Sequence, residues 1–192
     1  MKIYQLTGAS KYASCVVNDI QCMMEYEGVS LDDCWFWNVA GPQGDSWWPR
    51  ILERITEDDY PVGDYVYCSH SYAVIRKEAI EALKPVLGNS EILPLRCDFG
   101  DYWYVNILDV LDCLDLEASE YSTLPPLTPG GRQRILWISK HVFIPKRIQG
   151  HHIFKLSCKI PRASQVYVDE VFKKHVQKQG ITGMKFKLVW EG

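Results

Sequence analysis

Hydrophobic and polar positions alternate over several short segments of the chain, and this pattern is typical of strands. Near the C-terminus Met184, Phe186 and Leu188 alternate with lysines, which predicts a half-buried strand over 184–190. A turn at 99–101 is expected to form a hairpin. Apolar and β-branched runs predict the other strands, at 2–6, 65–67, 91–95, 102–107, 134–138, 142–144, 153–156 and 165–168.

Helical spacing of apolar residues predicts fewer elements. Apolar positions in 75–87 fit one helix, which Pro85 should kink or end because proline has no backbone N–H to donate. A second helix is predicted after Asp169, which can cap it, with Gly180 as its end. Short helical segments are also expected at about 49–56 and at 108–116.

Strands therefore outnumber helices, and no repeated β-α-β unit is visible. We expect the α+β class, with a mainly antiparallel sheet and two or three short helices. Residues 1–60 contain turn-rich stretches such as 41–45 and predict a loop-rich N-terminal lobe. Residues 61–192 are expected to form the α+β domain, in one compact unit with the lobe. A loop is predicted at 123–131, the richest Pro/Gly stretch of the chain.

Composition is that of a globular domain, with 47% hydrophobic and 23% charged residues. No apolar run approaches the length of about 18 residues that a spanning helix needs, and the N-terminus lacks the apolar run of a secretory signal. We therefore expect a cytoplasmic protein with no membrane segment. The seven cysteines are an odd number without a CxxC pair, which indicates reduced thiols and no structural zinc site.

The net charge of −3 hides a strong asymmetry along the chain. Residues 1–131 carry a net charge of −13, and residues 132–192 carry +10. Residues 97–131 alone hold seven carboxylates and no Lys or Arg: Asp98, Asp101, Asp109, Asp112, Asp115, Glu117 and Glu120. Like charges three residues apart destabilise a helix unless a cation lies opposite. That cation could come from a basic partner or from the basic C-terminal part of this chain, and the sequence leaves both open.

Tryptophans are concentrated in the N-terminal part, where four of the seven fall within 14 residues. Trp35 and Trp37 suit core packing. Trp47 and Trp48, beside Asp45 and after a Gly/Pro turn, are better candidates for a surface anchor, because Trp is enriched at interface hot spots. Base stacking is the rival use of such rings, but the acidic surroundings disfavour nucleic acid here.

Catalytic signatures were sought and not found. The sequence has no GxSxG, P-loop, GxGxxG or HExxH pattern. Cys68 and His70 lie near each other along the chain, but this spacing alone does not make a catalytic pair. His151 and His152 are strand neighbours and point to opposite faces, so a metal site with His141 or His175 is not expected. The sequence thus predicts a protein without cofactor or metal, and the paired acids Asp98 and Asp101 leave an enzyme only as the last alternative.

The order of short motifs in 75–190 resembles a bacterial family of immunity proteins from polymorphic toxin systems, immunity family eleven, formerly a domain of unknown function. The residues that carry the resemblance are EALKPVLG at 81–88, EILPL at 91–95, YWYVNI at 102–107, LDLEASE at 114–120, IFKL at 153–156, VYVDEVF at 166–172 and GITGMKF at 180–186. The first 60 residues have no counterpart in it.

The resemblance implies a protein without enzymatic activity that binds and neutralises a cognate toxin made by the same cell or its kin. It supplies no contact residues, so the predicted toxin-binding residues come from charge and aromatic character alone. They are Asp45, Trp47, Trp48, Asp58, Asp59, Asp98, Asp101, Glu117 and Glu120. We expect them to meet a basic toxin surface and to block it sterically and electrostatically, and a homo-oligomer is compatible with this picture.

The alternative is a nucleic-acid-binding or regulatory module that uses the basic C-terminal part. Such a module would place lysines and arginines on phosphate groups and would bind RNA or DNA in a salt-dependent way. The residues concerned are Lys140, Lys146, Arg147, Lys155 and Lys159.

Overall fold

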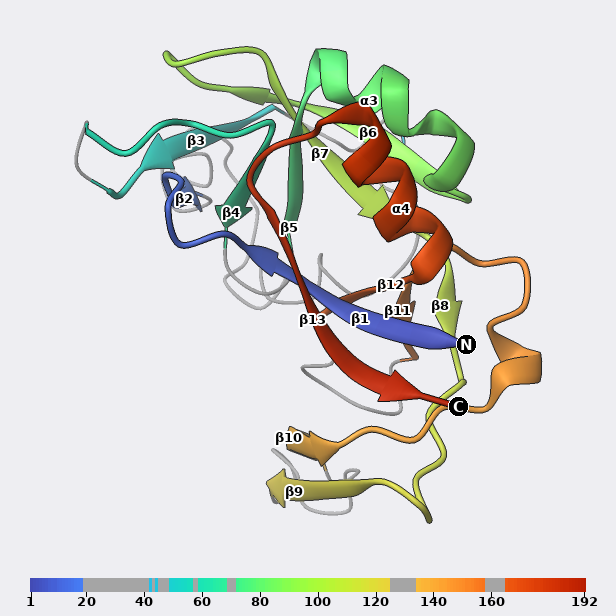
Figure 1. The fold of residues 1–192 in the computed structure, drawn as a ribbon. Coiled ribbons are helices and arrows are strands. Elements are labelled where there is room, and N and C mark those ends of the chain that lie inside the picture. Colours follow the sequence, from blue (N-terminus) through green and yellow to red (C-terminus); the bar gives the residue numbers. More distant parts are fainter. Residues whose placement is uncertain are drawn as a thin grey trace.

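Two sheets and a separate two-stranded hairpin make up the computed structural model of the chain (Figure 1). It describes residues 1–18, 42, 44, 49–56, 59–68, 72–124, 134–157 and 165–192. The first sheet has the strand order β2-β3-β6-β7-β5-β4. Its strands are β2 (Cys15–Asn18), β3 (Arg50–Arg54), β4 (Tyr65–Cys68), β5 (Tyr72–Arg76), β6 (Ser90–Arg96) and β7 (Tyr102–Ile107).

The second sheet has the order β13-β1-β12-β11-β8 and combines the first strand of the chain with the last ones. Its strands are β1 (Lys2–Gly8), β8 (Val110–Leu111), β11 (Ile153–Leu156), β12 (Val166–Asp169) and β13 (Met184–Glu191). The hairpin consists of β9 (Glu120–Leu124) and β10 (Arg134–Lys140) and projects from the body at the bottom of Figure 1.

Two α-helices, α3 (Lys77–Leu83) and α4 (Glu170–Gln179), and two 3-10 turns, η2 (Lys84–Val86) and η3 (Pro145–Arg147), complete the described elements. The predicted α+β class is confirmed in its coarse features: the described residues form mostly strands with two short α-helices, in two sheets and a hairpin rather than one sheet. Most pairings are antiparallel, while β3–β6 and β11–β8 are parallel. None of the described helices is long and apolar enough to cross a membrane.

The largest core cluster lies between the two sheets, where α3 and α4 also pack. Ile75 and Val105 come from the first sheet, Leu6 and Val168 from the second, and Phe172 from α4. A second cluster covers the other face of the first sheet, and a third covers the other face of the second sheet. Both sheets are therefore buried on both faces over much of their length. This explains why hydrophobic and polar residues alternate strictly in few of their strands.

The hairpin at 91–95 and 102–107 is confirmed as β6–β7, and so are the strands near 2–6, 65–67, 134–138, 153–156, 165–168 and 184–190. The helix after Asp169 is confirmed too. The Asp169 carboxylate accepts a hydrogen bond of 2.8 Å from the N–H of Phe172, and Gly180 ends α4 with φ of 67°. The helix predicted over 75–87 is shorter, because Ile75 and Arg76 belong to β5 and Pro85 lies in η2.

Three local predictions are wrong. Residues 50–54 form β3 rather than a helix, since β2 and β6 pair with them on either side. Residues 108–116 are extended at β8, where they pair with β11, and contain no helix. In 142–144 only Phe143 makes a bridge, to Leu114. In each case a partner that is distant along the chain decided between conformations that the short segment allows equally.

The division of the chain at residue 60 stays a prediction. The first strand, β1, lies between β12 and β13, so it belongs to a sheet of C-terminal strands. The two chain ends meet at this sheet, where the N–H of Gly192 donates to the carbonyl of Met1 at 3.1 Å and Lys2 pairs with Glu191 at 3.4 Å.

Candidate functional site

The predicted contact residues that the structure describes lie in two separate places (Figure 1). Asp45, Trp47, Trp48 and Asp58 lie outside the described residues. Of the others, Asp59, Asp98 and Asp101 lie in loops of the first sheet, and Glu117 and Glu120 lie at the start of β9 (Figure 1). The β6–β7 turn is at the upper end of that view and β9 is at its lower end, so the acids occupy two separate places.

At the upper end, the two loops are held together by Tyr102. Its hydroxyl donates to the carbonyl of Gly63 at 2.7 Å, and its ring contacts that of Phe99. Asp101 is compensated internally, because it pairs with Lys77 at 3.4 Å and accepts from Trp103 Nε1 at 3.0 Å. Asp98 is exposed and forms no ion pair within the described part of the chain.

At the lower end, Glu120 pairs across the hairpin with Lys140 at 3.5 Å. Glu117 is exposed, and no cation of the described residues pairs with it. Its N–H donates to Asp115 Oδ1 at 3.1 Å, so Asp115 stabilises the turn that leads into β9. Glu120, which pairs across the hairpin, and Asp115, which stabilises the turn, therefore have local structural roles.

The acids at 109 and 112 face the chain's own basic part. Asp109 lies 2.9 Å from His151 Nδ1, and Asp112 pairs with Arg147 at 3.4 Å. Of the two sources of a cation that the sequence left open, the structure supplies the intramolecular one for Asp112. The charge asymmetry along the chain is thus partly cancelled in the fold.

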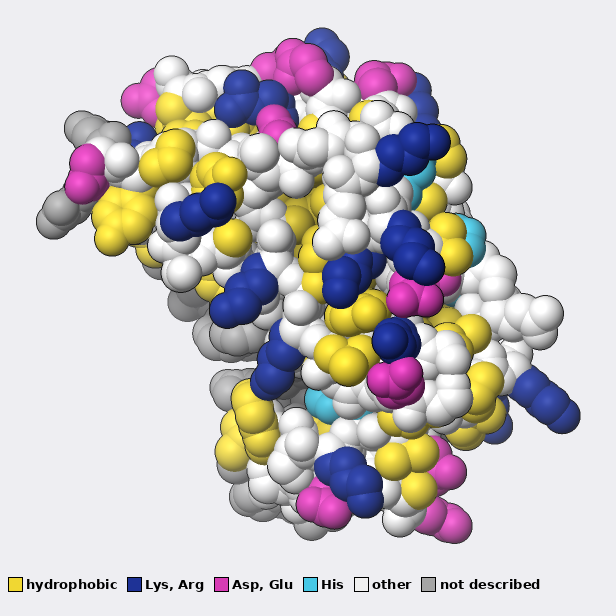
Figure 2. Space-filling model, in the orientation of Figure 1, with side chains coloured by type: hydrophobic (Ala, Val, Ile, Leu, Met, Phe, Trp, Pro, Cys, Tyr) yellow, Lys and Arg dark blue, Asp and Glu magenta, His cyan; other side chains and the backbone are white. Residues whose placement is uncertain are grey.

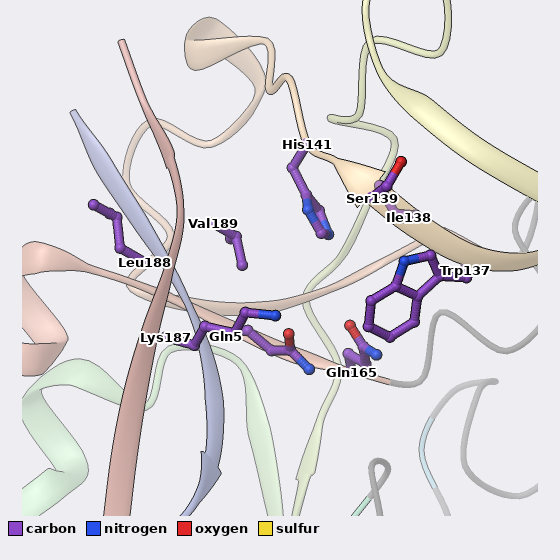
Figure 3. A pocket seen from close by; sticks show the side chains of 9 residues that line it. All are labelled: Gln5, Trp137, Ile138, Ser139, His141, Gln165, Lys187, Leu188 and Val189. Carbon is purple, nitrogen blue, oxygen red and sulfur yellow. The ribbon is translucent and has the colours of Figure 1, made fainter.

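A pocket opens where the hairpin meets the second sheet (Figure 3). One wall consists of residues 137–139 of β10 and His141, which follows that strand. The opposite wall consists of residues 187–189 of β13, and Gln5 of β1 and Gln165 lie between the walls. The pocket has a volume of about 140 Å³. It joins residues that are up to 184 positions apart in the sequence.

Two polar residues of the lining, His141 and Gln165, are linked through Tyr167. The Tyr167 hydroxyl donates to Gln165 Oε1 at 3.0 Å and lies 3.1 Å from His141 Nε2. Because a tyrosine hydroxyl has one proton, His141 Nε2–H is assigned as the donor to Tyr167. Burial, with a smaller effect of the Lys187 charge, lowers the pKa of His141 to about 4. Burial likewise raises the pKa of Tyr167.

Lys187 supplies the charge of the pocket. It is exposed, and its ammonium lies 5.7 Å from the centre of the Trp137 ring, in cation–π range. No carboxylate of the described residues pairs with it. A band of Lys and Arg side chains crosses the middle of the face shown in Figure 2, and most Asp and Glu of that face lie above and below it.

Two irregularities in β10 shape the pocket wall. The register with β9 shifts between Ile135 and Trp137 and again between Ile138 and Lys140, so β10 has two extra residues. Such bulges redirect side chains. Ile135 is buried in the third core cluster, whereas the Trp137 side chain is 55% exposed at the pocket mouth.

The sequence-based search for contact residues missed this pocket. The one local signal was the uninterrupted apolar run at 135–138, which a strand with one solvent-facing side should not have. His141 was weighed only as a metal ligand. His151 and His152 instead hydrogen-bond to Asp109 and Asp169 respectively, and the described residues contain no group of three or more metal-ligating side chains.

Comparison with protein families identifies one part of the chain. No curated protein matches it. Residues 98–190 match the model of the immunity protein family (Imm11), a stretch that runs from the β6–β7 turn through the hairpin and the pocket walls to β13. The match begins later than the expected residue 75 and leaves the first 97 residues unassigned. The resemblance read from short motifs is thus confirmed as a match to the immunity protein family Imm11 over residues 98–190.

Proposed function

We propose that this chain is an immunity protein that binds a cognate bacterial toxin and neutralises it by covering the toxin surface on which its activity depends. The family match over residues 98–190 carries the proposal. It covers the hairpin and four of the five strands of the second sheet, β8, β11, β12 and β13, so it concerns a large folded unit. Action by binding requires no cofactor and no catalytic residue.

Exposed acids are proposed as part of the contact surface. Charges of opposite sign on two partners speed their encounter and disfavour wrong partners. Asp98 and Asp101, with Asp59, form the upper set, and Glu117 and Glu120 form the lower set. Because the two sets lie at separate places, one compact toxin surface would use one of them. Asp45, Trp47, Trp48 and Asp58 stay proposed contacts.

Nucleic-acid binding finds less support among the described residues. Lys155 is only 3% exposed and donates to Asn106 Oδ1 at 3.4 Å, so it is not available to phosphate. Lys140 and Arg147 pair with Glu120 and Asp112. Compensated or buried cations release few counterions, and the salt-dependent binding of this alternative would be weak.

Co-expression with the toxin encoded beside its gene tests the function. We expect the wild-type chain to protect cells from that toxin and to co-purify with it as a stable complex. The control is a chain of the same family paired with a different toxin, which should neither protect nor bind. Loss of viability despite a soluble, abundant chain, together with absence of a complex, would contradict the proposal.

A further inference from the structure

We propose that the pocket between β10 and β13 receives an acidic side chain, Asp or Glu, from the toxin, while Trp137 packs against apolar atoms around it. This inference rests on the proposed function and specifies the part of the surface through which it would act.

The charge of the pocket selects an anion. Among the lining residues Lys187 carries a full positive charge, and none of the lining residues is acidic. His141 stays neutral near pH 7, because its lowered pKa of about 4 lies far below that pH. The surrounding face adds to the positive potential, since Lys185 on β13 is exposed and a basic band lies over this region (Figure 2).

Neutral donors around Lys187 suit a carboxylate. The Oε1 atom of Gln165 already accepts the Tyr167 proton, so the amide NH₂ of Gln165 is left to donate. Gln5 brings a second amide to the same space (Figure 3). A carboxylate accepts several such bonds at once, and charge-assisted bonds are about twice as strong as neutral ones.

The size of the pocket suits a side chain. Its volume of about 140 Å³ leaves room for a carboxylate with its one or two methylene groups.

An exposed aromatic ring at the mouth indicates that the anion arrives on a protein. Trp137 is 55% exposed and lies at the opening (Figure 3). A free small carboxylate would leave this ring in water, whereas a protein surface around an inserted acid would bury it. Trp is among the residues most enriched at interface hot spots. The bulges that direct Trp137 outward serve such a contact.

The test compares charge reversal at two lysines of one strand. Lys187→Glu should weaken the complex with the toxin by about 10- to 100-fold, because a repelled carboxylate would be buried against it. Lys185→Glu makes the same charge change on the same strand outside the pocket lining and should weaken it no more than about 3-fold. Lys187→Gln and Trp137→Ala should each give an intermediate loss. Affinity is measured by titration calorimetry, and circular dichroism checks that each variant folds.

Two outcomes separate this inference from the proposed function. If the wild-type chain binds and protects while Lys187→Glu, Lys187→Gln and Trp137→Ala bind as tightly, the pocket inference is overturned and the function stands. If the wild-type chain forms no complex, both are overturned. A further arm adds 10 mM glutamate or acetate to the wild-type complex: binding of the free carboxylates to the pocket, with unchanged toxin affinity, would also overturn the toxin as the source of the anion.

Discussion

At the scale of single residues, His141 is a buried titratable side chain with a lowered pKa. It is 9% exposed, stacks on Phe143 and meets the edge of Tyr167. Neither ring offers a counter-charge to an imidazolium, and Lys187 disfavours one. His141 therefore couples the stability of this region to pH.

Acidification should destabilise the protein through His141. Its pKa is about 4 in the fold against 6.5 for an exposed histidine, so between these values the unfolded state binds more protons. The contribution is complete above pH 6.5 and is lost as the pH falls towards 4, by at most roughly 3 kcal/mol. Urea unfolding at pH 7.0 and 4.5 measures this loss. His141→Gln, which keeps a donor for Tyr167, should show a smaller loss, and an equal loss would contradict the assignment.

At the scale of elements, helices and strands are positioned both by local residues at their ends and by contacts with other elements. The Asp169 carboxylate both caps α4 and accepts from His152 Nδ1 at 2.8 Å. The start of β13 is held by β4, since the N–H of Tyr65 donates to the carbonyl of Thr182 at 3.0 Å. The local cap at Asp169 thus holds α4, and the long-range hydrogen bond from Tyr65 holds the start of β13, which follows α4 along the chain.

Removal of the α4 cap should lower stability measurably. Asp169→Ala leaves the N–H of Phe172 without its partner and should reduce the free energy of unfolding by about 1–2 kcal/mol. Asp169→Asn and Asp169→Ser can still cap and should recover most of this loss. Chemical denaturation of the three variants and of His152→Ala separates the cap from the histidine contact; a loss of equal size in all four would argue against capping.

A methyl group at Gly183 should damage the junction of β13 with β4. Gly183 has φ of 89°, and a Cβ there would overlap the carbonyl oxygen of Tyr65. Gly150 has nearly the same φ, 88°, but open space around it. Gly150→Ala should therefore cost about 1 kcal/mol for backbone conformation alone, and Gly183→Ala should cost at least about 2 kcal/mol more through the overlap. Thermal unfolding of both variants measures the difference, which would vanish if the backbone conformation alone mattered.

At the scale of the whole molecule, folding rearranges a charge pattern that runs along the chain. Asp112 pairs with Arg147, so part of the acidic segment is neutralised by the basic C-terminal part of the chain. Asp98 and Glu117 keep their charges exposed at opposite ends of the molecule. Acidic ends separated by a basic band are what a partner meets, not one uniformly negative face.

Charge removal at each end should reveal which acids meet the toxin. The double variant Asp98→Asn with Asp101→Asn is compared with Glu117→Gln with Glu120→Gln. We expect one pair to slow association by roughly 3- to 10-fold at low salt, because steering by charge acts mainly on the association rate. Surface plasmon resonance measures both rates. The effect should fade at about 0.5 M salt, where charges are screened beyond a few ångströms, and an effect that persists there would indicate a different cause.

Helices and strands were predicted correctly where the residues that determine them lie close together along the chain. The helix α4, its cap Asp169 and its terminating residue Gly180 lie within a dozen residues. The N-cap, the helical spacing of apolar residues and the glycine that ends the helix could therefore all be recognised in one short segment. The hairpin around Gly100 was visible for the same reason. The five residues Arg50–Arg54 fit a helix or a strand equally well, and they form a strand because β2 and β6 pair with them.

Local motifs also indicated the resemblance to the immunity protein family, whose model matches residues 98–190. They could not indicate the pocket. Its lining combines Gln5, Trp137, Gln165 and Lys187, which meet because β1 and β13 pair and because two bulges in β10 turn Trp137 towards them. The sequence determines how many acidic and basic residues the chain has. The tertiary structure determines which of these charges cancel, because ion pairs form between neighbours in space.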